Sequence, residues 1–194
     1  RKKEEVAVQK ALVAESALKQ MPFFKVPILS MASYLTMPGK TGIIAEFKRQ
    51  SPSKGVINAS ARVEEVTKAY ELFGASGISV LTDQQFFGGS LDDLSIAVQR
   101  KIPVLRKEFI VDEFQIIEAK AYGASVILLI AACLNVEQTK NLAVVAKSVG
   151  MEVLLELHDE SELGHICEEV DLVGINNRSL KSFEVNIEHS LQLK

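Results

Sequence analysis

Short apolar runs rich in β-branched residues recur along the chain, and a segment with helical periodicity follows most of them. The runs predict six strands, at residues 42–47, 77–82, 103–106, 125–130, 152–157 and 172–176. The segments between them predict helices at residues 62–73, 91–100, 112–122, 136–149 and 161–169. Because the strands lack polar alternation, both of their faces are expected to be buried, which is typical of a parallel sheet covered by helices.

The N-terminal part of the chain differs from the rest. Residues 2–19 place apolar side chains among charged neighbours and consist mainly of helix formers, which predicts an amphipathic helix. A connector punctuated by proline follows at residues 21–39. We therefore divide the chain into an N-terminal helical extension at residues 1–40 and a single α/β domain at residues 41–194.

Polar residues at the ends of the strands decide between a doubly wound open sheet and a (β/α)8 barrel. The first strand leads into Glu46 and Lys48, where a nucleotide-binding sheet would have a glycine fingerprint. Polar pairs instead end several strands: Glu46 and Lys48, Thr82 and Asp83, Arg106 and Lys107, Glu156 and His158, Asn176 and Arg178. In a barrel these ends converge on one mouth, where active sites are built.

Six strands cannot close an eight-stranded barrel, so roughly two βα units would be missing. The sequence therefore predicts a (β/α)8 TIM barrel of the α/β class with an N-terminal helical extension, truncated after about six βα units.

Composition and charge narrow the function classes. A net charge of -3 and a pI near 5.7 give no reason to expect binding to nucleic acid or to an acidic membrane surface. The longest apolar stretch, residues 126–134, is too short to span a bilayer. Cys133 and Cys167 match neither a disulfide framework nor a metal-ligand spacing, so we expect no metal site and a reducing, cytoplasmic location.

Two clusters of charged residues could carry acid/base chemistry. Strand alternation places Glu46 and Lys48 on one face, where both a structural ion pair and a catalytic role fit. Lys107 follows the third strand, and a lysine in a dry mouth loses hydration, which lowers its pKa and suits general-acid work. A solvated Lys107 is the alternative.

Glu156 lies inside an apolar run, where an unpaired carboxylate is costly to bury. It therefore needs a cationic partner, which Lys107 or Lys48 could supply across the mouth. Asp159 is predicted to be the N-cap of the next helix, with Glu162 completing a capping box. The three histidines are interpreted as structural or solvent-facing.

Three further segments have both a binding and a structural interpretation. Asn176 and Arg178 suit recognition of a hydroxyl group and a carboxylate, or form a turn. Phe87, within residues 86–90, offers aromatic surface on a flexible loop that could cover a flat ring or pack against the rim. Ser51 opens the sequence Ser-Pro-Ser-Lys-Gly, which could be only a turn.

These clusters follow one another along the chain in an order similar to that found in one protein family. The sequence IIAEFKRQSPSKG at residues 43–55 resembles the signature of indole-3-glycerol phosphate synthase. Similar segments recur at residues 79–83, 86–90, 103–112, 174–178 and 183–185, so the resemblance runs from residue 1 to residue 194. It implies a (β/α)8 barrel whose N-terminal helical extension lies over its mouth. It also implies a carboxy-lyase of tryptophan biosynthesis that uses no cofactor.

The reaction implied by the resemblance converts 1-(2-carboxyphenylamino)-1-deoxyribulose 5-phosphate into indole-3-glycerol phosphate, carbon dioxide and water. The matching positions imply Lys107 as general acid, Glu156 as second acid/base and Glu46 as the group that orients the lysines. By the same resemblance Lys48 would hold a substrate anion, and Asn176 would bind a substrate hydroxyl. Ser51 and Arg178 would position the anthranilate part, and Phe87 its ring.

Comparison with the family also indicates which of its elements we do not find in this sequence. The family has two further strands whose glycine- and serine-containing loops bind the substrate phosphate, and no such segments follow residue 178. An inactive truncated fragment or an assembly partner is therefore one alternative. Another is a different phosphate-binding barrel such as phosphoribosylanthranilate isomerase, which uses a Cys and an Asp. The expected partner is a small phosphorylated substrate, and the oligomeric state stays open.

Overall fold

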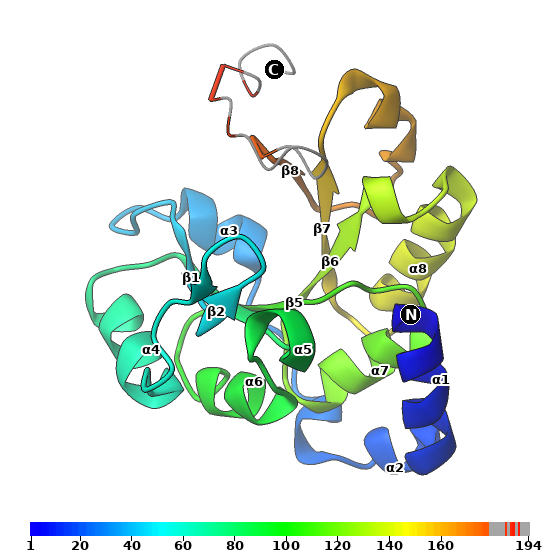
Figure 1. Ribbon diagram of the computed structural model, residues 1–194, viewed down its shortest axis with the longest axis horizontal. Helices are drawn as coiled ribbons and strands as arrows, with labels where there is room; N and C mark the ends of the chain where they lie inside the picture. The colour runs from blue at the N-terminus through cyan, green and yellow to red at the C-terminus, as the bar shows by residue number, and fades with distance from the viewer. Residues whose placement is uncertain (179–184, 186, 189, 191–194) are drawn as a thin grey trace.

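The computed structural model describes residues 1–178, 185, 187, 188 and 190 of the 194-residue chain. Six parallel strands form one sheet: β1 (Ile44–Phe47), β4 (Gly77–Leu81), β5 (Val104–Lys107), β6 (Val126–Ile130), β7 (Glu152–Leu157) and β8 (Leu172–Ile175). All six predicted strands are confirmed. Each strand pairs with the next along the sheet in the order β1-β4-β5-β6-β7-β8, and Figure 1 shows that they form an open arc.

Helices cover the outer face of this arc, as the sequence predicts: α4 (Val63–Leu72), α6 (Leu91–Ala97), α7 (Glu113–Ala121) and α8 (Val136–Ser148). The segment after β7 differs from its prediction. It forms a 3-10 helix, η3 (Glu160–His165), instead of an α-helix at residues 161–169. Gly164 near its end has weak helix propensity, and 3-10 geometry is common in pieces this short. The repeated strand and helix units confirm a TIM-barrel-type α/β fold.

The N-terminal extension contains two helices in place of the single helix predicted for residues 2–19. Helix α1 (Lys2–Leu12) ends before Val13, whose backbone is extended, and α2 (Glu15–Leu18) follows. The break lets Val6 and Leu18 both bury against α7. A straight helix would place these two side chains more than three turns apart. Figure 1 shows α1 beside α7, so α1 lies on the helical layer. Lys2 at its start pairs with Asp83 and Glu108, which follow β4 and β5, so the first turn of α1 reaches the rim of the mouth.

The extension continues through η1 (Pro22–Lys25) to α3 (Met31–Thr36) at the amino end of the arc. The fully buried Met31 packs there against inward-facing residues such as Leu105 and Val126. Glu152, the first residue of β7, accepts a hydrogen bond from the Met31 backbone N–H at 2.7 Å. Because Met31 fills the amino end of the arc, the accessible mouth lies at the carboxyl ends of the strands.

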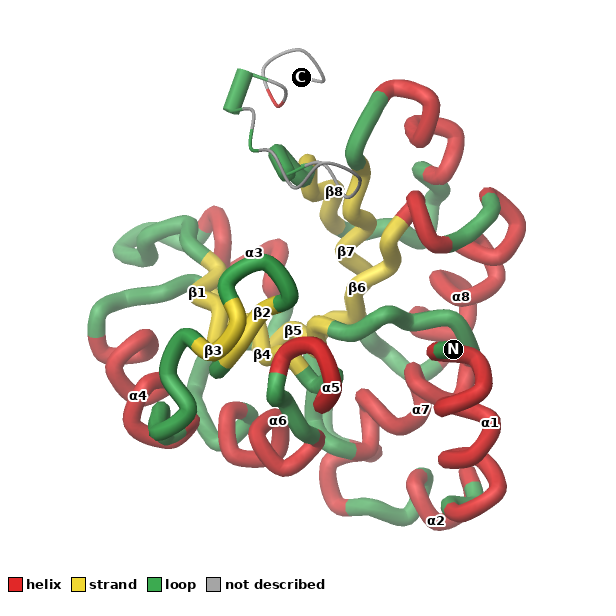
Figure 2. The backbone as a smooth tube through the Cα atoms, viewed as in Figure 1, coloured by secondary structure: helices red, strands yellow, loops and turns green. Residues whose placement is uncertain are grey.

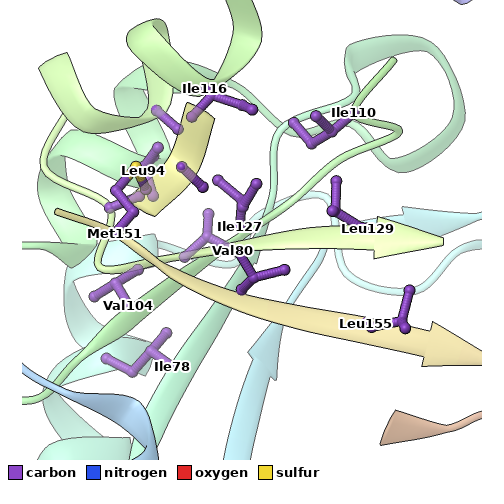
Figure 3. Packing of buried hydrophobic residues seen from close by; sticks show 14 of the residues in the cluster. Ile78, Val80, Leu94, Val104, Ile110, Ile116, Ile127, Leu129, Met151 and Leu155 are labelled. Atoms are coloured by element: carbon purple, nitrogen blue, oxygen red, sulfur yellow. The ribbon is translucent and has the colours of Figure 1, made fainter. Parts of the chain in front are cut away.

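The main hydrophobic core lies between the outer face of the sheet and the helices. Figure 3 shows the side chains that fill it, among them Ile78, Val80, Val104, Ile127 and Leu155. Burial on this face explains why the strands are continuous apolar runs, since the inner face is apolar as well. Within the described part of the chain, no helix is long and apolar enough to cross a membrane.

Candidate active site at the mouth

Two lysines share one carboxylate at the mouth. Lys107, the last residue of β5, donates from Nζ to Oε2 of Glu46 on β1 at 2.9 Å, and Lys48 donates to Oε1 of the same group. Phe47 points to the opposite, buried face, as alternation predicts. Arg49 fixes the chain beyond Lys48 through a bidentate pair with Asp93, with N–O distances of 2.6 and 2.9 Å. Lys48 is therefore held facing Glu46.

The charge state of Glu46 follows from these contacts. Burial raises the pKa of its carboxyl group, but the positive charge of Lys107 and the hydrogen bond from Lys48 outweigh burial, so the pKa lies below its ordinary value of 4.5. Glu46 is therefore ionised at neutral pH. An ionised carboxylate can accept hydrogen bonds from both ammonium groups at once, one on each oxygen.

The Glu46 cluster should contribute to stability in a pH-dependent way. A lowered pKa in the folded state gives stabilisation that is present above the ordinary value of 4.5 and is lost as the pH falls through the folded value. In urea unfolding, Glu46→Gln should therefore reduce the free energy of unfolding most at neutral pH. The gap between parent and variant should shrink in acid. A gap that is constant or grows in acid would contradict the assignment.

Glu156 lies in a second group, on β7. Its Oε1 accepts a hydrogen bond from the side-chain amide of Asn176 at 3.0 Å, and Nε2 of His158 lies 3.4 Å away. The expectation that Lys107 or Lys48 pairs with Glu156 is wrong, since no ion pair joins them among the described residues. Both lysines are already bound to Glu46, and β6 separates β5 from β7.

His158 is a site residue that the sequence interpretation missed. It stands two positions after Glu156, so alternation places both side chains on the same side of the chain. His158 lies between two carboxylates, because Nδ1 is 3.6 Å from Oε2 of Glu162. Asp159 caps η3 through the Ser161 N–H, as predicted, and Glu162 accepts from the backbone N–H of His158, so the predicted capping box with Glu162 stays a prediction.

Arg178 connects the two ends of the arc. Its Nη1 donates to Oγ of Ser53 at 3.1 Å, and its backbone N–H donates to Oδ1 of Asn176 at 3.0 Å. Ser53 lies in the turn between β2 (Gln50–Ser51) and β3 (Gly55–Val56), a small antiparallel hairpin after β1 that Figure 2 shows beside α5. Ser53 therefore contacts Arg178 in the described structure, and the predicted role of Ser51 in positioning the substrate stays a prediction.

Phe87 brings aromatic surface close to Lys107. It ends α5 (Gln84–Phe87), whose N-cap Asp83 accepts from the Phe86 N–H at 2.7 Å, so this segment is a capped helix and not the expected flexible loop. Phe87 and Lys107 line a cavity of about 40 Å³ together with Leu81, Asp83, Glu108, Phe109, Leu128 and Ile130. Lys107 thus binds the Glu46 carboxylate through its ammonium group and also borders a mainly apolar cavity.

Gly89 fixes the position of this helix. A Cβ at residue 89 would lie 2.0 Å from the carbonyl oxygen of Leu81, so the backbone can pass the end of β4 only with glycine there. Gly89→Ala should lower the free energy of unfolding by about 1–3 kcal/mol, as overpacking does. Gly164→Ala is the control, because its Cβ would meet only Val136 at 3.9 Å. Equal stability of the two variants in urea would contradict this packing.

Arg106 has a role different from that of Lys107. It points to the helical side of the sheet, is 3% exposed, and donates to Oε2 of Glu118 on α7 at 2.8 Å and to Oγ1 of Thr82 at 3.2 Å. Asp83 pairs with Lys2 of the extension at 2.7 Å. The grouping of Thr82 and Arg106 with the mouth is therefore wrong for their side chains, which bind other elements together. Asp83 pairs with the extension and also borders the cavity beside Phe87 and Lys107.

The cysteines have no activated thiol. Desolvation and the charges of Glu156 and Glu162 raise the pKa of Cys133, and burial with a hydrogen bond to Glu169 raises that of Cys167. Among the described residues, no group of three or more His, Cys, Asp or Glu side chains could hold a metal ion.

The fold and the site define an enzyme of the (β/α)-barrel class, because acidic and basic side chains meet at the carboxyl ends of parallel strands. A sequence profile described as indole-3-glycerol phosphate synthase matches residues 1–194. The chain therefore belongs to the indole-3-glycerol phosphate synthase family.

Curated relatives agree. The chain is 44% identical over 193 residues to the indole-3-glycerol phosphate synthase of Bacteroides thetaiotaomicron, covering 99% of this chain and 74% of that protein. Identity is also 44%, over 200 aligned positions, to the synthase of Neisseria meningitidis serogroup C, covering 99% of this chain and 76% of that protein. Membership confirms the resemblance drawn from residues 43–55 and the prediction of a carboxy-lyase of tryptophan biosynthesis. It decides against phosphoribosylanthranilate isomerase.

The similarity to solved structures is weaker than the similarity to these relatives in sequence. The carboxyl transferase domain of Rhizobium etli pyruvate carboxylase aligns with 70% of this chain and 27% of its own at 11% identity, with a TM-score of 0.48. A similarity this low carries no argument about function.

Proposed function

We propose that the mouth of this chain closes the pyrrole ring of indole-3-glycerol phosphate, with Lys107 as the general acid. The substrate is the phosphorylated compound 1-(2-carboxyphenylamino)-1-deoxyribulose 5-phosphate. Its ring carbon that bears the carboxylate attacks the ketone carbon, the ketone oxygen takes a proton, and carbon dioxide and then water leave. The observation that carries the proposal is the position of Lys107, which binds the Glu46 carboxylate and borders a mainly apolar cavity that Phe87 also lines.

Lys107 suits proton donation to the ketone oxygen. The hydrogen bond to Glu46 fixes the direction of its ammonium group, and its side chain borders the mainly apolar cavity. A flat aromatic ring packed against Phe87 would place the neighbouring ketone near Nζ of Lys107. Glu46 is the residue that orients both lysines.

Several cationic and polar groups would position the substrate. Lys48 stands next to Lys107 on the same carboxylate, so it can hold the carboxylate that later leaves as carbon dioxide. Arg178, hydrogen-bonded to Ser53 of the turn that follows Ser51, can hold the anthranilate part together with Ser51. Asn176 offers its amide to a substrate hydroxyl.

Glu156 is the proposed acid/base for the dehydration step. It lies on β7 among groups that do not include Lys107, so the two acids are separated and can act on different sides of the ring. In the protonated form Glu156 would donate to the departing hydroxyl, which leaves as water. His158 and Asn176 both contact Oε1, so they determine the direction in which the carboxyl group points.

Product formation tests this proposal. Indole-3-glycerol phosphate should form from the carboxyphenylamino-deoxyribulose phosphate, measured with this chain and with a version extended by the two further βα units that the family resemblance implies. Turnover in either protein supports the assigned reaction. Turnover only in the extended version would mean that the added segment supplies part of the substrate site. Absence of turnover in both would overturn the assignment in favour of a non-catalytic assembly partner.

A cytoplasmic location is part of the proposal and is checked by cell fractionation.

A further inference from the structure

A second cavity lies at the end of the arc opposite to the mouth. It has a volume of about 220 Å³ and lies beside the amino ends of β5 and β6, where Val104 and Ser125 border it. One wall comes from the N-terminal extension, with Phe23 of η1 and Ile28 of the following connector. The opposite wall is apolar too, with Val98 and Ile102. The cavity is therefore separate from the groups that surround Glu46 and Glu156.

Two cations border this cavity without a carboxylate. Arg100 and Lys120 are both among its lining residues, and none of the lining residues is acidic. Nε of Arg100 is buried and has no hydrogen-bond partner in the described structure. A buried, unpaired donor of this kind costs free energy until an acceptor reaches it.

Lys120 is the more deeply buried of the two. It is 5% exposed, and burial alone lowers the pKa of its ammonium group. Its Nζ donates to the backbone carbonyl of Val26 at 2.8 Å, which uses one of its three donor hydrogens. No acidic residue among those that line the cavity accompanies this charge. An anion between Arg100 and Lys120 would satisfy both groups.

The walls restrict what that anion can be. A space of about 220 Å³ is smaller than the roughly 300–1,000 Å³ of drug-sized ligand sites, so the ligand must be compact. Its charged end must reach Arg100 and Lys120, and its body must pack against Phe23 and Val98. We propose that this cavity binds a small monocarboxylate with an aromatic or branched apolar body, bound through its carboxylate by Arg100 and Lys120.

Benzoate is the probe for this site. Amide chemical shifts of Gly123 and Ser125, which border the cavity, should change saturably with benzoate. Benzyl alcohol has the ring without the charge and acetate has the charge without the ring, so both should bind at least about tenfold more weakly. The amide of Asn176 reports on the mouth in the same titration.

Two variants remove the charges one at a time. Arg100→Gln should weaken benzoate binding about tenfold or more, since a charge-assisted hydrogen bond contributes about 1.5–3 kcal/mol. Lys120→Gln keeps a donor for the Val26 carbonyl and should weaken binding similarly without loss of the fold. The matched control is Lys101→Gln, which removes an exposed charge next to Arg100 and should leave binding unchanged.

The proposal is overturned if benzoate produces no saturable shifts at Gly123 and Ser125. Equal binding of benzyl alcohol would also overturn it, because recognition would then not involve the carboxylate. The same holds if both Arg100→Gln and Lys120→Gln bind benzoate as tightly as Lys101→Gln does.

Discussion

Lys107→Met is expected to lower the turnover number for indole-3-glycerol phosphate formation by about 100- to 10,000-fold, the usual contribution of a general acid. Methionine keeps most of the length of the side chain and its apolar contacts with the cavity beside Phe87, but it has no proton to donate. The Michaelis constant should change much less, because the proposed role of Lys107 lies in the transition state. Steady-state kinetics on the more active of the parent and extended proteins provides the measurement.

The control for this prediction is Lys101→Met, which removes one positive charge from an exposed position far from the mouth. It should retain the parent turnover number. If Lys107→Met keeps more than about a tenth of the turnover number, Lys107 is not the general acid. A rise in the Michaelis constant alone would instead assign Lys107 to substrate binding.

Arg106→Met, unlike Lys107→Met, should act on stability. It should lower the free energy of unfolding by about 3–5 kcal/mol, since it leaves the buried carboxylate of Glu118 without its cation. Urea unfolding provides the measurement. The matched control is Arg62→Met, whose ion pair with Glu65 is exposed and contributes little. Adding Glu118→Gln to Arg106→Met should recover part of the loss. A loss no larger than that of Arg62→Met would contradict the structural role of Arg106.

The fold was largely predictable because the strands are buried on both faces. Continuous apolar runs such as residues 126–130 allow few other interpretations, and the structure places a strand in each. The N-terminal helix was predicted too long, because helix propensity does not reveal that Val6 and Leu18 must reach the same partner helix. Tertiary packing decided that boundary.

The candidate site was predictable only where chemistry and strand alternation coincide. Alternation places Glu46 and Lys48 together and also separates Lys107 from Arg106, although the sequence interpretation applied it only to the first pair. The contact between Arg178 and Ser53 joins residues 125 positions apart, and no local pattern encodes it. No sequence motif predicts the cavity beside Arg100, because elements distant in sequence form its walls.

The strand order of the sheet has a consequence for folding kinetics. Each strand pairs with the strand that follows it in the chain, apart from the β2–β3 hairpin, so every sheet contact closes a loop of only one βα unit. Loops of this length carry a modest entropic cost, which favours stepwise growth of the sheet from any starting pair. The Arg178 to Ser53 hydrogen bond closes a far longer loop, so it forms after the strands between its two ends have assembled.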